Sequence, residues 1–291
     1  MRFNSASCLF LLLALVLPGD FATFGQAAPE TLPEVKPLPP ALRERLKLAS
    51  FYQKYLDLYG VPVLGSAKVS DYAMREAAWI VGHMLEEHPE ILQTMSANGA
   101  RLVVMAYNEY TTDLPEQSHW KPKEQWDERA RGMGGRITSC AEENLLCFPG
   151  DPYDTENILI HEFAHAIANC GLNKLAPDFN ERLKKAYKDA KEAGLWKGTY
   201  AGTNRSEYWA ESVQDWFDNN RQNDSAHNWV HTRTQLKQYD PEVAALCQEV
   251  FGDRDWRYHK PMERPENERA HLAGYDPAKA PAFTWRKANS Q

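Results

Sequence analysis

Two histidines and a glutamate stand close together in the segment LIHEFAH, residues 159–165. His161 and His165 are four residues apart, which on a helix places both side chains on one face, one turn apart. Two imidazoles in that arrangement can bind one tetrahedral zinc ion. Glu162 lies one step around the helix, where its carboxylate can accept a proton from a water molecule beside the ion. The pattern therefore predicts one zinc ion per chain and hydrolytic chemistry.

A catalytic zinc site needs a third protein ligand and one open position. The longer pattern HExxHxxGxxH is excluded, because Ala168 and Gly171 stand where it has its glycine and its third histidine. A carboxylate on a later helix can supply the ligand instead. The segment YAGTNRSEYWAESVQDWF, residues 200–217, offers three carboxylates spaced four residues apart on one helix face: Glu207, Glu211 and Asp215.

The motif HEFAHAI followed by YAGTNRSEYWAE resembles the zinc metallopeptidase domain of anthrax lethal factor and of the clostridial Pro-Pro endopeptidases, which are gluzincins. In that family a tyrosine is followed seven residues later by a ligand glutamate, and four residues after that by a second glutamate. The resemblance covers residues 155–220 and is not visible in residues 28–99 or beyond 251. It implies Glu207 as the third zinc ligand, Tyr200 as an aid to catalysis, and Glu211 as a carboxylate supporting a ligating histidine.

The spacing of the two glutamates is compatible with the same assignment. A ligating histidine usually donates its other N–H group to a carboxylate, which fixes its tautomer. Glu211 lies one helical turn beyond Glu207 and can serve His161 or His165 in this way. The reverse assignment, with Glu211 as the ligand and Glu207 on the surface, stays open at this point. The Tyr200 hydroxyl is a candidate donor to the oxyanion of a tetrahedral intermediate.

The hydrophobic pattern predicts helices before the motif and a short strand region between them. Residues 41–59 and 70–92 have helical periodicity, the second with Ser70 as a plausible N-cap, and residues 102–107 are apolar and β-branched enough for a buried strand. Residues 111–136 are predicted to be a long surface loop. Residues 137–148 are predicted to be one or two short strands, with Glu142 and Glu143 at a solvated turn.

The helix that carries HEFAH is expected to begin after an N-cap at Asp154 or Thr155, to run to about Asn169, and to have Gly171 just past its end. Later segments are also helical in pattern. They are residues 177–193, a helix from Asn204 or Ser206 to residues 219–220, and residues 228–238 and 241–251.

Early strands followed by helices indicate an α+β fold. Together with the resemblance, this implies a mainly helical, zincin-like metallopeptidase domain with a small mixed sheet beside the HExxH helix. The expected organisation is a signal peptide over residues 1–27, a Pro-rich linker over 28–40, an N-terminal helical region over 41–99, the catalytic domain over 100–251, and an irregular tail over 252–291.

Charge and the first residues bear on partners and location. The formal net charge is −7 and no block of five Lys or Arg residues occurs, which argues against nucleic-acid binding. Arg2, the apolar residues 8–17 and small residues before position 28 are typical of a secretory signal. The expected product is a monomeric protein that is secreted, extracellular or periplasmic, independent of membranes after signal cleavage, and active on peptides or proteins.

Four cysteines remain after signal removal, and an oxidising compartment would favour disulfides between them. The expected pairs are Cys140–Cys147, across a short hairpin, and Cys170–Cys247, between two helices. Four free buried thiols are the alternative.

Two other functions are compatible with the sequence. One is a zinc-bearing binding or toxin-like module without proteolysis, and the other is a carbohydrate-binding or wall-binding protein with structural zinc. In the peptidase hypothesis, residues 137–148 are the candidate sheet edge for an extended substrate. His227 and His231 repeat the four-residue spacing with Asn228 between them, so they are expected to be ordinary surface or packing histidines.

Overall fold

The computed structural model describes residues 34–286, which contain a mixed five-stranded sheet with helices packed on both of its faces. The strand order is β1-β2-β3-β4-β5. The pairs β1–β2 and β2–β3 are antiparallel, whereas β3–β4 and β4–β5 are parallel. The predicted α+β fold with a small mixed sheet is confirmed. The strands are β1 Lys36–Pro37, β2 Lys54–Leu58, β3 Val61–Gly65, β4 Arg101–Met105 and β5 Ile137–Ala141.

A hairpin replaces the second half of the helix predicted over residues 41–59. The helix α1 ends at Leu46, and β2 and β3 are joined by Tyr59 and Gly60, both with positive φ (49° and 87°). Two such residues form the tight turn whose twist matches that of an antiparallel strand pair. The helical prediction is therefore wrong here, because pairing with a buried neighbour strand overrides an ambiguous apolar pattern.

Strand β4 separates two apolar cores. Leu102 and Val104 face the large core shared with the long helices, whereas Val103 and Met105 face a smaller core that includes Leu42 of α1. Alternation along the strand accounts for this division, since successive side chains point to opposite faces of a sheet. The predicted strand over residues 102–107 is thus present as β4.

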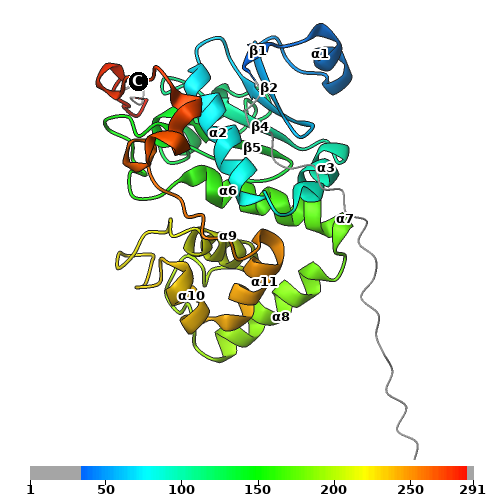
Figure 1. Ribbon diagram of the computed structural model, residues 1–291, viewed down its shortest axis with the longest axis vertical. Coiled ribbons are helices and arrows are strands. Elements are labelled where there is room, and N and C mark those ends of the chain that lie inside the picture. The colour runs from blue at the N-terminus through cyan, green and yellow to red at the C-terminus, as the bar shows by residue number, and fades with distance from the viewer. Residues whose placement is uncertain (1–33, 287–291) are drawn as a thin grey trace, which may run out of the picture.

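The motif helix α6 (Ile158–Ala166) lies between the sheet and a group of later helices, as Figure 1 shows. It packs on β5 on one side and on α9 (Arg205–Trp216) on the other. The helix α6 is thus in contact with other elements on two sides, and nearly all of its apolar residues are buried. The other helices are α1 Pro40–Leu46, α2 Asp71–Met84, α3 Pro89–Ala97, α4 Lys123–Asp127, α5 Glu142–Leu145, α7 Asn173–Leu175, α8 Phe179–Glu192, α10 Arg233–Tyr239 and α11 Pro241–Phe251.

Several predicted helix ends differ from the observed ones. Ser70 does cap α2, since its hydroxyl accepts a hydrogen bond from the amide of Tyr72, but the helix predicted over residues 70–92 is broken before Pro89, which starts α3. The N-cap of α6 is Asn157 rather than Asp154 or Thr155. After α6 the chain continues as a π-helical turn, Ile167–Leu172, which contains Gly171. An added Cβ at Gly171 would lie 2.8 Å from the Ile91 side chain, so α3 can approach closely only with glycine here.

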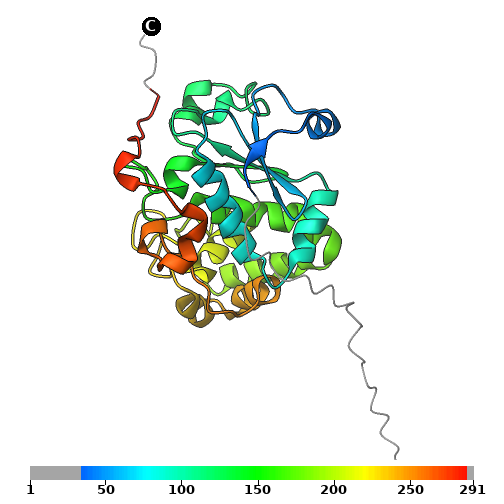
Figure 2. The same ribbon diagram turned by 45° about the horizontal axis from the view of Figure 1, so that its top comes forward.

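The C-terminal segment from residue 252 consists of loops and short 3₁₀ turns, and it packs back on the molecule beside α2 (Figure 2). The turns are Pro261–Glu263, Glu266–Leu272 and Pro277–Lys279, and a further one, Thr111–Asp113, lies in the loop after β4. The fully buried guanidinium of Arg264 pairs with the fully buried Glu76 at 2.6 Å, and His271 reaches the same carboxylate at 2.7 Å. The segment is irregular, as predicted, but it contributes to the core.

The two predicted disulfides are not present, and all four cysteines in the described residues are free. Residues 140–147 form a strand followed by α5 rather than a hairpin, and the Cys140 sulfur faces the Val103 carbonyl in β4. Cys247 on α11 faces the Ser212 carbonyl of α9, whereas Cys170 lies on the π-helical turn after α6. Each predicted pair therefore places its two cysteines in different packing environments.

Between residues 34 and 286, no helix combines the length and the apolar character that crossing a membrane requires. The predicted signal peptide and residues 28–33 of the predicted Pro-rich linker lie outside the described residues.

Candidate metal centre and active site

The helix α6 presents His161 and His165 one turn apart on the face that is turned toward α9. Their Nε2 atoms are 3.3 Å apart, and the two rings lie edge to face with centroids separated by 5.0 Å. The Asn157 side chain accepts the amide of Ile160 and thereby satisfies one free donor at the start of α6. The helix is thus held at its N-terminus immediately before the motif.

Glu207 reaches the same place from α9. Its Oε2 atom lies 3.0 Å from Nε2 of His161 and 3.5 Å from Nε2 of His165. Asn204 caps this helix by accepting the amides of Ser206 and Glu207, at 2.8 and 3.1 Å. The cap fixes the first turn of α9, so the carboxylate is delivered from a well-defined helix end.

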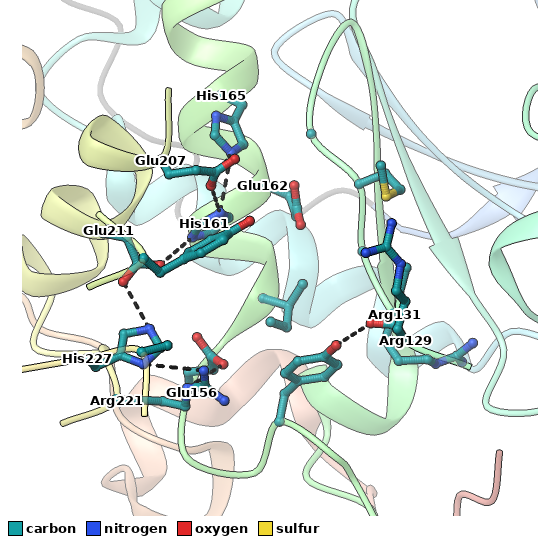
Figure 3. A pocket seen from close by; sticks show the side chains of 18 of the residues that line it. Arg129, Arg131, Glu156, His161, Glu162, His165, Glu207, Glu211, Arg221 and His227 are labelled. Carbon is teal, nitrogen blue, oxygen red and sulfur yellow. Dashed lines mark hydrogen bonds and ion pairs between the residues drawn. The ribbon is translucent and has the colours of Figure 1, made fainter. Parts of the chain in front are cut away.

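The three atoms fit the face of a tetrahedral metal site. One ligand atom from each of His161, His165 and Glu207 lies within 4.8 Å of the other two, and Figure 3 shows the side chains converging. Ligand atoms about 2.0–2.1 Å from a tetrahedral zinc are about 3.3–3.4 Å apart. The observed separations of 3.0, 3.3 and 3.5 Å match that geometry, and two imidazoles with one carboxylate form a donor set that suits zinc.

The site is electrostatically coupled. Burial alone would lower the pKa of His161, but hydrogen bonds to Glu207 and Glu211 raise it well above its usual value. For Glu207, burial would raise the pKa, and the neighbouring His161 and His165 lower it far below the usual range. Without a metal, a proton on His161 therefore forms a hydrogen bond to the Glu207 carboxylate. A metal cation that binds here must displace that proton.

The second nitrogen of His161 has its own partners. Its Nδ1 atom lies 2.8 Å from Oε1 of Gln214 and 3.3 Å from Oε1 of Glu211. The Gln214 amide nitrogen donates to Glu156 at 2.9 Å, so its oxygen faces the ring and accepts the Nδ1 proton. This arrangement leaves Nε2 free to bind a metal. Gln214 was not predicted from the sequence, although it lies one helical turn beyond Glu211.

Glu211 does not meet His165 or Glu207 at the donor triangle. It is buried, one oxygen faces His161, and the other faces Nε2 of His227 at 3.1 Å. Burial would raise its pKa, but the hydrogen bonds from His161 and His227 lower it to about 2. This position suits a carboxylate that orients a histidine, and it is unfavourable for the alternative in which Glu211 is the ligand and Glu207 lies on the surface.

Glu162 projects from α6 into the space between that helix and the opposite segment of residues 129–134 (Figure 3). Burial raises its pKa, and the charges of His161 and His165 partly oppose that rise. A carboxylate with a raised pKa is suited to exchange protons near neutral pH. Its position beside the donor triangle, without joining it, agrees with the predicted division of roles within the motif.

Tyr200 lies over the site at its solvent side. Its ring is stacked near that of His161, with centroids 6.2 Å apart, and the residue is 42% exposed. Partial burial and the nearby Glu207 raise the pKa of its hydroxyl to about 12, so it remains a hydrogen-bond donor. Its backbone amide donates to the Ala226 carbonyl at 2.7 Å, which ties its loop to residues 223–228.

A cleft of about 450 Å³ contains these groups. Its opposite wall is the segment around Gly132 and Gly134, between which Met133 exchanges two backbone hydrogen bonds with Ser139 of β5. An added Cβ at Gly134 would lie 2.6 Å from Cδ2 of His165 and 2.9 Å from Oε2 of Glu162. Glycine therefore permits the wall to approach the motif helix. The predicted loop over residues 111–136 thus contributes directly to the site.

The sheet edge near the site differs from the prediction. Residues 142–145 form α5 rather than a strand, and β5 is covered by Met133 along part of its edge. Glu142 and Glu143 are buried rather than solvated. Glu143 accepts two hydrogen bonds from the buried guanidinium of Arg131, the residue before Gly132, so this ion pair anchors the wall of the cleft.

The two later histidines behave differently. His231 is turned toward the Trp229 carbonyl, as expected of an ordinary histidine. His227 is buried, lines the cleft and contacts Glu211, a position beside the site that the prediction of an ordinary surface or packing histidine did not specify. The four-residue spacing gave no indication of this contact, which depends on the fold of residues 223–228.

Comparisons with known proteins do not identify a family for this chain. No protein-family model matches the chain, and no curated protein matches it either. Among solved structures, the Pro-Pro endopeptidase PPEP-2 from Paenibacillus alvei is similar with a TM-score of 0.45 and 18% identity. The similarity covers 65% of this chain and 97% of that one. A likeness this distant carries no function over to the chain.

Proposed function

We propose that this chain is a zinc-dependent peptidase that hydrolyses peptide bonds. The observation that carries the proposal is the triangle of His161, His165 and Glu207 donor atoms, with the carboxylate of Glu162 beside it in an open cleft. Three protein ligands leave a fourth tetrahedral position for a reactant. A bound zinc ion would lower the pKa of water and polarise a carbonyl group there.

The protein side chains around the metal site have separate roles in peptide hydrolysis. Glu162 takes the proton of the attacking water and later delivers it to the leaving amine. The protonated hydroxyl of Tyr200, whose pKa is raised to about 12, donates a hydrogen bond to the developing oxyanion. Gln214 and Glu211 hold His161 by its Nδ1 atom, so its Nε2 atom stays directed into the triangle.

The wall segment gives a basis for binding an extended peptide. Both backbone hydrogen-bonding groups of Met133 are paired with Ser139, which places residues 132–134 at the outer edge of the sheet. The backbone of Gly134 is hydrogen-bonded to Glu162, and the main-chain groups of Gly132 are proposed to face the substrate. A substrate strand can pair with such groups by main-chain hydrogen bonds. This edge replaces residues 137–148 as the proposed docking strand.

Export also belongs to the proposal. The apolar N-terminal run is the basis for proposing that the protein is secreted, extracellular or periplasmic. That it acts there as a monomer is a separate proposal. N-terminal sequencing of the exported protein and light scattering would test both points. A mature protein that retains residues 1–27 would contradict the signal-peptide assignment.

Substitution of Glu162 by Gln tests the function. The variant should bind one zinc ion per chain but cleave a peptide library about 10²–10⁴-fold more slowly, because only the proton acceptor is removed. Glu181→Gln, on the exposed face of α8, is the matched control and should behave like the wild type. Wild-type cleavage by Glu162→Gln would refute the mechanism. Zinc binding without cleavage by any form would favour a non-proteolytic binding module or a wall-binding protein with structural zinc.

A further inference from the structure

His227 belongs to a tight turn formed by residues 223–228, which has no ligand role in the proposed mechanism. The turn is closed by backbone bonds from Asn223 to Asn228 at 2.7 Å and from Asp224 to His227 at 3.2 Å. The Asp224 carboxylate accepts the amides of Ala226 and His227 and lies 2.9 Å from Nδ1 of His227. The imidazole is therefore held in one orientation by its own turn.

The other ring nitrogen of His227 contacts the carboxylate that supports His161. Nε2 of His227 lies 3.1 Å from Oε2 of Glu211, whose Oε1 lies 3.3 Å from Nδ1 of His161. Asn220 donates to the same Oε2 atom at 3.1 Å. Nδ1 of His227 faces the Asp224 carboxylate and, at 3.3 Å, a guanidinium nitrogen of Arg221. Nε2 of His227 faces Glu211, so this nitrogen is the donor that compensates the buried carboxylate.

The same turn also holds Tyr200. The Ala226 carbonyl, one residue before His227, accepts the Tyr200 amide at 2.7 Å. Tyr200 lies on an exposed loop, within which its carbonyl accepts hydrogen bonds from Thr203, and the bond to Ala226 ties this loop to the turn of residues 223–228. The same turn thus provides a backbone acceptor for the loop of Tyr200. It also places the His227 side chain against Glu211, as Figure 3 shows.

From these contacts we infer that His227 is a positioning residue, which orients the zinc-binding His161 through Glu211 and registers Tyr200 over the same site. The inference rests on the proposed function. His227 thus contributes to the metal site from outside the two helices that carry the HExxH and glutamate motifs. A ligating histidine whose outer partner is disturbed typically loses 10- to 100-fold in metal affinity or activity.

Three variants of the full chain test the inference: His227→Leu fills the space without a donor, His227→Gln restores a donor, and His231→Ala is the control. Zinc affinity, measured by competition with a chromogenic chelator, should fall about 10- to 100-fold in His227→Leu and by much less in His227→Gln. The visible spectrum of the Co²⁺-substituted protein should shift in His227→Leu only. His231→Ala should match the wild type in both measurements, because its ring contacts the Trp229 carbonyl and not the site.

Two results would overturn the inference. One is wild-type zinc affinity in folded His227→Leu, and the other is equal loss in the Leu and Gln variants, which would indicate a packing role alone. If the Leu variant does not fold, Asp224→Asn provides the comparison, because it keeps the acceptor of the turn but weakens the hold on His227; an unchanged cobalt spectrum there would also refute the inference.

Kinetics tests the connection to Tyr200. In a Tyr200→Phe background, His227→Leu should reduce kcat by a smaller factor than it does in the wild type, since part of its effect acts through the lost hydroxyl. Full additivity would exclude that connection. The affinity measurements need no substrate, so a protein that loses zinc affinity on substitution but cleaves nothing would refute the proposed function and leave the positioning role intact.

Discussion

Oε2 of Glu207 lies 3.0 Å from Nε2 of His161, although 46 residues separate the two in the chain. The contact joins the first turn of α9 to the middle of α6, and it exists because these two helices pack against each other. The donor triangle is thus a property of one helix pair. Changes that alter this packing should affect metal binding even where no ligand is touched.

Removal of Glu207 and removal of Glu211 should have different effects on metal content. Glu207→Ala takes away one of three donors and should lower zinc affinity by at least about 100-fold, more than the loss typical of an outer partner. Glu211→Ala should lower it by about 10- to 100-fold. Elemental analysis and chelator competition measure both. A greater loss in Glu211→Ala would support the reverse assignment of ligand and partner.

Tyr200→Phe should retain zinc and lose turnover. The hydroxyl is proposed to bind only the developing oxyanion, so kcat should fall by about 10²–10³-fold with little change in KM. Steady-state kinetics on any cleaved peptide would measure this. A rise in KM at unchanged kcat would instead assign Tyr200 to substrate binding.

Gly134→Ala should damage the site through packing. The new methyl group would lie 2.6 Å from Cδ2 of His165 and 2.9 Å from Oε2 of Glu162, so the wall or the motif helix must move. We expect a loss of at least about 10-fold in kcat/KM, since small displacements of catalytic groups are costly. Gly82→Ala on α2 is the control: nothing lies within 4 Å of its added Cβ. That variant should be fully active and slightly more stable.

In the metal-free protein, the contact between Glu211 and His227 should contribute most to stability between about pH 4.5 and 6.5. The pKa of Glu211 is lowered from 4.5 to about 2, so its contribution is present above pH 4.5 and is lost as pH falls toward 2. The pKa of His227 is raised from 6.5, so its contribution is complete below pH 6.5 and is lost as pH rises through the folded-state value. Thermal unfolding across this range would measure the optimum.

Zinc should change that profile. Metal binding requires unprotonated histidine nitrogens, so the stabilisation by zinc should grow as pH rises. Unfolding temperatures with and without zinc at about pH 5.5 and pH 8 would show it. An equal zinc effect at both values would contradict competition between the metal and the His161 proton.

The buried pair of Glu76 and Arg264 should make the C-terminal segment essential to stability. Arg264→Met leaves a buried carboxylate with only His271 as a charged partner, and it should cost about 3–5 kcal/mol. Lys188→Ala breaks an exposed pair with Glu192 on α8 and should cost at most about 0.5 kcal/mol. Urea unfolding compares the two. Equal small losses would mean that the segment contributes little to the fold.

Local sequence patterns determined the helix faces and helix ends that carry the metal-binding residues. The four-residue spacing of His161 and His165, the cap at Asn204 and the periodicity of α9 are all readable along the sequence, because helix faces and helix ends depend on neighbours a few residues away. The donor types at positions 161, 165 and 207 also indicated zinc before any contact was known. The expectation that these side chains meet came from their resemblance to a known motif.

Only the tertiary structure decided the rest. The hairpin of β2 and β3, the burial of Glu143 by Arg131, and the approach of Gly134 to Glu162 each depend on segments that are distant or irregular in the chain. The absence of the predicted disulfides has the same origin, since the cysteines at 140 and 247 face different packed neighbours. His227 is the clearest case: its residue type suggested little, and packing against Glu211 gives it a place beside the metal centre. Sequence periodicity specifies which face of an element is apolar, whereas the choice of partner for that face depends on burial across the whole chain.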